Sequence, residues 1–383
     1  MTLGALDTPA LVVDLDVVRA NVAAMADLAR ERGVALRPHA KTHKLPQVAR
    51  LQLDAGAVGL TVAKLGEAEV FADAGVEDLL IAYPLVGEPK LGRLVALARR
   101  VPRLAVAVDS AEVAEGISRA LEAVGGGLSV GVRIEVDTGM RRLGLAPASE
   151  QLVALARTVA ALPALRLEGV MTHEGQAYQS DGEAELARAA AEACDLMVAS
   201  AEAIRAAGID CPVVSMGSTA TARFAAGHPG VTEIRPGTYV FNDRSQLAHG
   251  SARDGDLAAA VVATVVSRPS PEVACVDAGA KALTSDRMIV RDAAADYGAV
   301  APGAAGWAAV GATARAAGWP VARASEEHGL IAVPPGGELA VGERLALVPN
   351  HICPAVNLFD AVTVVAGGRV VDRWPVAARG RMT

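Results

Sequence analysis

Two patterns alternate along residues 18 to 240, and this alternation constrains the fold more than any other feature of the chain. Segments with helical periodicity are separated by short apolar runs rich in β-branched residues, which are typical of buried parallel strands. The predicted helices span residues 18–32, 46–55, 65–74, 90–99, 111–124, 149–161, 183–207 and 220–226. The predicted strands span residues 34–37, 57–62, 79–82, 104–108, 128–134, 167–171, 213–216 and 232–235. Eight strands alternating with helices predict an α/β fold, a (β/α)₈ TIM-type barrel.

After about residue 245 the pattern changes to short strands separated by Gly and Pro turns, without long helices. We therefore expect a mainly β C-terminal domain after the barrel. The run 10–14 precedes the first barrel helix and is expected to pair with this domain. The predicted domains are a barrel over residues 18–244 and a β domain over residues 1–17 plus 245–383. The strands expected in the β domain are 257–266, 273–277, 329–333, 343–348 and 361–365.

Charge and apolar runs exclude several classes of protein. The formal net charge is −7 and no basic face stands out, which argues against nucleic acid as a partner. No uninterrupted run of about 18 apolar residues is found, so no membrane span is expected. The first residues lack a charged and then apolar leader, and four scattered cysteines show no CxxC spacing. We expect a reduced, cytoplasmic protein.

Lys41 lies in the segment RPHAKTHK at residues 37–44, just past the first predicted barrel strand. Barrel enzymes carry their reactive groups at the carboxyl ends of the strands. A lysine in this position is a candidate for a Schiff base with an aldehyde cofactor. The alternative is an ordinary exposed basic loop, because lysine is exposed by default.

The ends of the seventh and eighth strands carry small and hydroxyl residues that suit an anion. Gly217, Ser218 and Thr219 open the predicted helix, and Gly237 and Thr238 follow the neighbouring strand. Backbone N–H groups at a helix start bind phosphate well, and barrels often hold phosphate at these two loops. The alternative for Gly217–Thr219 is a plain helix N-cap.

Two arginines and a histidine are expected near the barrel mouth. Arg142 and Arg235 could each face a cofactor's ring nitrogen or phenolic oxygen, or pair with Glu135, Asp137 or Glu233. His173 could pack flat on the ring or be a core histidine.

Motifs along the whole chain resemble those of one family of pyridoxal-phosphate (PLP) enzymes. They are DTPAL at 7–11, RPHAKTHK at 37–44, GEAE at 66–69, GST at 217–219, RPGTYVFN at 235–242, DAGAK at 277–281, SEEHG at 325–329 and PNHIC at 349–353. The chain is similar to the D-threonine aldolase and D-serine dehydratase family of fold-type III, or alanine racemase-like, enzymes. The resemblance implies PLP bound to Lys41. The cofactor-binding residues expected with it are Arg142, His173, Tyr178, Gly217, Ser218, Thr219, Arg235, Gly237, Thr238 and Tyr239.

The pair His351 and Cys353 is the element that separates members of this fold. Two residues apart on an extended segment, both side chains would face the same side. Imidazole and thiolate suit Zn²⁺ or a similar divalent ion. The resemblance implies that this pair holds a divalent metal, Zn, Mn or Mg, beside the cofactor and takes part in catalysis with Lys41.

The expected activity is metal-dependent retro-aldol cleavage of a small D-β-hydroxy amino acid, of the type D-threonine to glycine plus acetaldehyde. The alternative is a dehydratase acting on D-serine or D-threo-3-hydroxyaspartate, because His-x-Cys resembles the dehydratase branch. An amino-acid racemase is a further alternative, suggested by GMRRLG at 139–144. A PLP-binding regulator without turnover is a different class, against which the extra β domain argues. The resemblance also implies a homodimer.

Overall fold

The computed structural model describes residues 6–287, 295–303 and 305–383, and the chain divides into two compact units. The barrel unit comprises Ala24–Lys41, Val48–Gly237 and Gly380–Thr383. The β unit comprises Met1–Ala23, Thr42–Gln47 and Thr238–Arg379. None of the helices in the described ranges has the length and apolar character that a membrane crossing requires.

The barrel unit is built on one parallel eight-stranded sheet with the order β2-β9-β8-β7-β6-β5-β4-β3. The sheet closes on itself, because Thr61 N–H donates to the Pro38 carbonyl and Ala40 N–H to the Thr61 carbonyl, each at 2.8 Å. This confirms the predicted barrel fold. The strands are β2 (Ala35–Leu36), β3 (Leu60–Val62), β4 (Asp78–Ile81), β5 (Arg103–Val108), β6 (Val130–Glu135), β7 (Leu165–Met171), β8 (Val213–Met216) and β9 (Glu233–Ile234).

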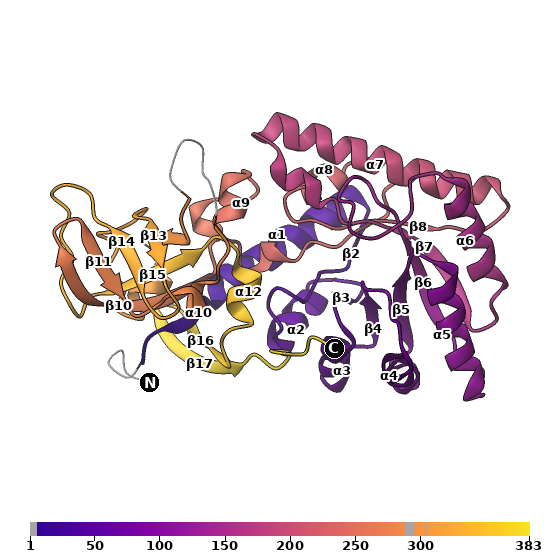
Figure 1. Cartoon of the computed structure of the whole chain (residues 1–383), viewed down its shortest axis with the longest axis horizontal. Coiled ribbons are helices and arrows are strands. Elements are labelled where there is room, and N and C mark those ends of the chain that lie inside the picture. Colours follow the sequence, from indigo (N-terminus) through magenta and orange to yellow (C-terminus); the bar gives the residue numbers. More distant parts are fainter. Residues whose placement is uncertain (1–5, 288–294, 304) are drawn as a thin grey trace. The chain divides into compact units, whose positions relative to one another are not determined.

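Helices follow the strands in sequence, as the alternation predicts (Figure 1). They are α1 (Leu15–Arg32), α2 (Pro46–Asp54), α3 (Leu65–Asp73), α4 (Glu88–Ala98), α5 (Ala111–Ala123), α6 (Glu150–Ala161), α7 (Glu183–Ala206) and α8 (Ala222–Ala225). The short 3-10 helix η2 (Gly175–Gln179) lies between β7 and α7. Ser110 and Ser149 cap α5 and α6 by accepting backbone N–H groups, which explains where these helices begin. The helix predicted over residues 220–226 is confirmed over Ala222–Ala225.

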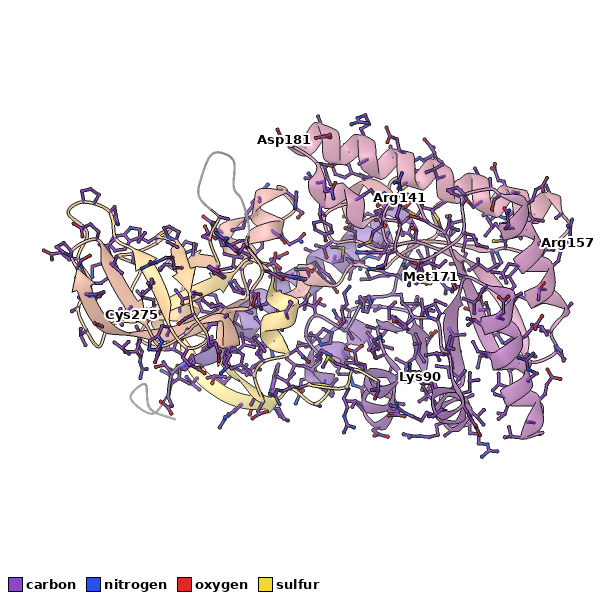
Figure 2. The ribbon with its side chains drawn as sticks, in the orientation of Figure 1. Lys90, Arg141, Arg157, Met171, Asp181 and Cys275 are labelled. Carbon is purple, nitrogen blue, oxygen red and sulfur yellow. The ribbon has the colours of Figure 1, made fainter. Side chains whose placement is uncertain are left out.

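Apolar side chains fill part of the barrel interior. Leu80 on β4, Ala105 and Ala107 on β5 and Met171 on β7 form one buried cluster. Figure 2 labels Met171 of this cluster. Since β4 and β7 are not neighbours in the sheet, these side chains meet across the interior. Small alanines between larger residues let opposite strands pack closely.

Charged side chains fill another part of the interior. Glu233 on β9 accepts from Arg37 (Nε–Oε2, 2.9 Å) and from Arg133 on β6 (Nη1–Oε1, 2.8 Å). Arg37 also pairs with Asp78, and Arg133 with Glu168 at 3.2 Å. The guanidinium of Arg133 is thus held in a buried ion network.

The β unit contains a nine-stranded sheet. β1 pairs antiparallel with β10 and parallel with β16, which confirms the expected pairing of the N-terminal run with this part of the chain. Three strands, β12, β13 and β17, were not predicted. The strands are β1 (Ala10–Asp14), β10 (Ala259–Ser270), β11 (Val273–Val276), β12 (Gly298–Val300), β13 (Val321–Ala324), β14 (Gly329–Ala332), β15 (Arg344–Pro349), β16 (Ala361–Ala366) and β17 (Arg369–Pro375).

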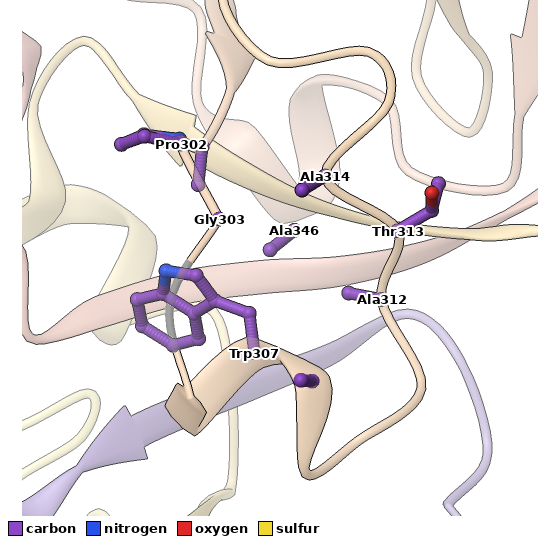
Figure 3. Close-up of a pocket in the computed structure, with 9 residues that line it drawn as sticks. Pro302, Gly303, Trp307, Ala312, Thr313, Ala314 and Ala346 are labelled. Carbon is purple, nitrogen blue, oxygen red and sulfur yellow. The ribbon is translucent and has the colours of Figure 1, made fainter.

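Short helices connect these strands, and a core of apolar residues that includes Val12, Val262, Trp307 and Val365 lies between them. An apolar cavity of about 320 Å³ opens beside Trp307, between alanines and Thr313 (Figure 3). Its walls contain none of the predicted site residues. The helical segments are η3 (Thr238–Val240), α9 (Arg244–Ala248), η4 (Asp254–Asp256), α10 (Ala280–Leu283), α11 (Ala305–Ala308) and α12 (Ile352–Val356).

Candidate active site

Lys41 lies past the carboxyl end of β2, where the barrel closes. Its backbone N–H donates to His39 Nδ1 at 3.3 Å, and His39 N–H donates to the Pro236 carbonyl beyond β9 at 2.9 Å. The Lys41 side chain is half-buried, and the next residues, His43 and Lys44, are buried. This segment is therefore not the exposed basic loop of the alternative interpretation.

His173 follows β7 and lies within the electrostatic reach of Lys41. Burial, together with the charge of Lys41, lowers the pKa of His173 to about 3. Its Nδ1 hydrogen-bonds the carbonyl oxygen of Gly217. Because a carbonyl only accepts, Nδ1 carries the hydrogen and Nε2 keeps its lone pair. The histidine is thus neutral and tied to the loop that follows β8.

The loop after β8 differs from the predicted anion seat in one respect. The Gly217 N–H donates to Oε2 of the buried Glu174 at 3.1 Å, and the other oxygen of Glu174 accepts from the Thr221 hydroxyl. The Gly217 amide was expected to be free for a phosphate, but Glu174 occupies it. No signal in the sequence distinguished Glu174 as part of this loop.

The same loop has one feature that fits a phosphate. The hydroxyl oxygen of Ser218 is buried and has no hydrogen-bond partner among the described residues. An unpaired buried hydroxyl costs free energy, so a ligand oxygen there would satisfy it. A Cβ at Gly217 would meet Arg235 Nη2 at 2.6 Å and the Thr172 carbonyl at 3.0 Å, which explains the glycine. The residues present therefore fit the phosphate of PLP.

Arg235 on the next strand end is buried and well held. Its backbone N–H donates to the Met216 carbonyl at 2.7 Å, while its guanidinium donates to the Ser215 hydroxyl and the Thr172 carbonyl. Burial lowers the pKa of Arg235. Arg142 is exposed on the loop after β6. Only Arg235 is thus fixed by its surroundings.

Glu135 at the end of β6 lies near both arginines. Burial raises the pKa of its carboxyl to about 7, although Arg235 and Arg142 act to lower it. Buried carboxyls with a raised pKa are found at active sites more often than elsewhere. Sequence reasoning considered Glu135 only as a salt-bridge partner of these arginines.

The remaining predicted cofactor residues lie in short 3-10 segments. Tyr178 in η2 packs against a cluster that includes Ala220, just after the Gly217–Thr219 turn. Gly237 ends the barrel unit, and Thr238 and Tyr239 begin η3 of the β unit. Thr238 Oγ1 lies 3.8 Å from the sulfur of Cys353.

His351 and Cys353 are close together, but not on the extended segment that was expected. His351 is the extended residue before α12, and Cys353 lies within this helix. Burial acts to lower the pKa of His351. The charge of Cys353 and its hydrogen bond to the imidazole act in the other direction, as do the charges of Asp243 and Asp286. Together they raise the pKa of His351 to about 9. The helix start, rather than strand alternation, brings the two side chains together.

The two donors fit an ion that keeps open coordination positions. Within the described ranges, no three His, Cys, Asp or Glu side chains form a group that could hold a metal. A divalent ion on this pair would therefore need water and substrate as further ligands, an arrangement that leaves positions open for chemistry.

Comparisons with known proteins agree with a division of the chain into two units. The family model "Alanine racemase, N-terminal domain" matches residues 13–245, and "Putative serine dehydratase domain" matches residues 258–365. A D-threonine aldolase of Arthrobacter sp is 35% identical over 99% of this chain and 94% of its own length. A D-threo-3-hydroxyaspartate dehydratase of Delftia sp. (strain HT23) is 38% identical over 97% of this chain and 98% of its own.

Solved structures agree as well. The D-threonine aldolase from Filomicrobium marinum is 33% identical, with a TM-score of 0.86, over 98% of this chain and 96% of its own. The dehydratase from Delftia sp. HT23 is 37% identical, with the same TM-score, over 98% of each chain. A cysteine variant of D-threo-3-hydroxyaspartate dehydratase was solved "in the metal-free form". Alanine racemase of Clostridium difficile 630, at 14% identity and a TM-score of 0.68, shares the fold alone.

Proposed function

The chain belongs to the family that joins an alanine racemase N-terminal domain to a serine dehydratase domain, and from this we propose that it cleaves D-β-hydroxy amino acids by a retro-aldol reaction, of the type D-threonine to glycine and acetaldehyde. Its full-length relatives are named aldolases and dehydratases, which are lyases, so the chain is an enzyme of the lyase class. The observation that supports a D-β-hydroxy amino acid as the substrate, in either reaction, is the His351–Cys353 pair on a chain that carries Lys41 past the first barrel strand. On this proposal Lys41 would hold the cofactor and the pair would hold an ion for the β-hydroxyl.

The family implies PLP, and the chain offers groups for each part of it. Lys41 would hold the cofactor covalently, and Ser218, Thr219, Gly237 and Thr238 would hold its phosphate. Arg235 would face the ring, because its guanidinium is held in place by Ser215 and Thr172. When bound, PLP withdraws electrons from the substrate's Cα. The other cofactor contacts proposed are Arg142, His173, Tyr178, Gly217 and Tyr239.

His351 and Cys353 would hold a divalent ion, Zn, Mn or Mg. Such an ion supplies Lewis-acid chemistry, lowering the pKa of a hydroxyl bound to it. Without an ion, the imidazole is drawn toward its protonated form by Cys353. Metal binding therefore has to displace a proton, which makes its affinity depend on pH.

In the cleavage itself, the β-hydroxyl of the substrate loses its proton and its oxygen becomes the aldehyde oxygen. The Cα–Cβ bond breaks, its electron pair stays at Cα, and Cα takes a proton to give glycine. Lys41 Nζ is the proposed donor of that proton. His173, neutral and tied to the Gly217 carbonyl, orients the loop rather than exchanging protons near neutral pH.

A dehydratase is the second candidate, and the cysteine of the metal pair favours it. The relatives include a D-threo-3-hydroxyaspartate dehydratase, of which a cysteine variant is described as metal-free. In this reaction Lys41 would take the α-proton and the β-hydroxyl would leave, giving an oxo acid and ammonia. Both reactions would use the same residues on a small D-amino acid, and we expect a homodimer in either case.

Product analysis tests the proposal. Purified protein is incubated with PLP, Mn²⁺ or Zn²⁺, and D-threonine, D-serine or D-threo-3-hydroxyaspartate. Glycine plus an aldehyde supports the aldolase, whereas an oxo acid with ammonia supports the dehydratase. Racemised amino acid would indicate the third reaction, and no turnover of any substrate would indicate a PLP-binding regulator. A Lys41→Ala variant that retained covalently bound PLP would refute the assignment of the lysine.

A further inference from the structure

Two carboxylate side chains lie close to the proposed metal-binding pair, His351 and Cys353. Neither was expected to bind the metal itself. The first is Asp286, whose Oδ2 lies 3.1 Å from Nδ1 of His351. A carboxylate accepts, so Nδ1 carries the hydrogen of this contact. Nε2 is then the nitrogen that remains for a metal ion. A carboxylate that fixes the tautomer and orientation of a ligating histidine is a recurring part of metal sites.

The second carboxylate, Asp243, is fully buried and joins two helix starts. Its Oδ1 accepts from the Gln246 N–H at 3.1 Å and the Ser245 hydroxyl at 2.6 Å, which caps α9. Its Oδ2 accepts from the Ile352 N–H at 3.0 Å. Ile352 is the residue between His351 and Cys353. One side chain therefore anchors the backbone that sets the spacing of the two donors.

Further hydrogen bonds connect the surroundings of the two carboxylates. The Ser245 N–H donates to the Asn350 carbonyl at 3.2 Å, and Arg244 Nη1 donates to Asn350 Oδ1 at 2.7 Å. Asn350 Nδ2 in turn donates to the Asp286 carbonyl at 3.1 Å. The segment before His351 is thus tied to the residues next to Asp243 and to the backbone of Asp286.

We propose that Asp243 and Asp286 form a carboxylate clamp that positions His351 and Cys353 for a divalent ion. Asp286 orients the imidazole, and Asp243 holds the backbone between the donors. Asp243 is not counted as a third ligand, because within the described residues it forms no metal-holding group with His351 and Cys353. This inference rests on the metal role in the proposed function. Loss of such supporting groups typically weakens metal binding about 10- to 100-fold.

The test measures metal affinity rather than turnover. Full-length, PLP-loaded protein is stripped of metal and titrated with Zn²⁺ and with Mn²⁺ by calorimetry. The variants are Asp286→Ala and Asp243→Asn. Asparagine caps helices about as well as aspartate, so the second variant keeps the α9 cap while losing the charge and one acceptor. Asp360→Ala is the matched control, because Asp360 is an exposed carboxylate of the same unit that pairs with Arg379 at 2.8 Å.

We expect both clamp variants to bind metal about 10- to 100-fold more weakly than the wild type, with the control unchanged. Without metal, the unfolding midpoint of Asp286→Ala should stay close to the wild type, whereas Asp243→Asn removes the acceptor of the buried Ile352 N–H and should lower the midpoint. Equal affinities in Asp286→Ala and the wild type would overturn the clamp while leaving the metal role intact. Absence of metal binding by the wild type would overturn the metal role and the clamp together. If Asp243→Asn lowers the unfolding midpoint, the metal affinity of Asp286→Ala decides whether the clamp exists. Asp286 is exposed, so its replacement should not disturb the fold.

Discussion

Glu174 binds the backbone of Gly217: its Oε2 accepts the Gly217 N–H at 3.1 Å, and its other oxygen accepts from the Thr221 hydroxyl. A buried carboxylate thus shapes the loop that we propose for the cofactor phosphate, instead of leaving the amide open to it. The loop is therefore built around the Glu174 side chain, and the Ser218 hydroxyl in it is buried without a hydrogen-bond partner among the described residues.

Two replacements of Glu174 should separate the effect of its hydrogen bonds from the effect of its charge. Glu174→Ala leaves a buried N–H and a buried hydroxyl unpaired, and we expect a loss of about 1–3 kcal/mol in the free energy of unfolding. Glu174→Gln can serve both groups with its amide and should cost less. Denaturant unfolding measures the stability, and titration of the apoprotein with PLP measures the affinity for the cofactor. Equal PLP affinity in Glu174→Ala and the wild type would show that the loop does not hold the phosphate.

Gly217→Ala should weaken PLP binding, because the new Cβ would lie 2.6 Å from Arg235 Nη2 and 3.0 Å from the Thr172 carbonyl. The arginine must move, and with it the group proposed to face the ring. Gly92→Ala is the control, since nothing lies within 4 Å of a Cβ there and the position is inside α4. Alanine in that helix should stabilise the protein by up to about 1 kcal/mol. PLP titration of both variants is the measurement.

Glu233 should support the barrel only above acid pH. Burial acts to raise its pKa, but Arg133 and Arg37 outweigh burial and lower it from 4.5 to about 2. A lowered pKa means stability that is complete above pH 4.5 and is lost as the pH falls toward 2. Glu233→Gln leaves two buried arginines without their shared partner and should cost about 3–5 kcal/mol near pH 7. Unfolding at pH 7 and pH 3 should show the two proteins converging at the lower pH.

Glu135 should have the opposite effect on stability. Burial raises its pKa from 4.5 to about 7, so the folded state holds this proton more tightly than the unfolded state. Its contribution to stability is present below pH 4.5 and is lost as the pH rises through 7. Glu135→Gln, which mimics the protonated form, should match the wild type at pH 4.5 and be more stable at pH 8. Equal unfolding midpoints at pH 8 would contradict the raised pKa.

Chelation should abolish turnover, and added Mn²⁺ or Zn²⁺ should restore it. Cys353→Ala should lose activity. The metal concentration that restores the chelated wild type should not restore this variant. Cys275→Ala is the control, because Cys275 is a buried cysteine on β11 of the same unit and far from the pair in sequence. Full activity after exhaustive chelation, checked by elemental analysis, would remove the metal from the mechanism.

The periodic parts of the chain were predictable from local sequence. The strand β8 was predicted with its observed bounds, because a short buried run carries its own signal. The missed strand β17 is mostly exposed and carries Arg369, Asp372 and Arg373, so its side chains show no apolar pattern. It forms because its backbone pairs with β16.

Sequence by itself determined the alternation of strands and helices, the position of Lys41 past the first barrel strand and the spacing of His351 and Cys353. Only the tertiary structure decided that β2 meets β3 to close the barrel, that Glu174 occupies the Gly217 amide, and that a helix start brings the metal pair together. The physical reason is the distance along the sequence over which each kind of interaction acts. Periodicity and turn residues act between neighbours in sequence, whereas burial, hydrogen-bond partners and pKa values depend on groups that meet only when distant segments fold together.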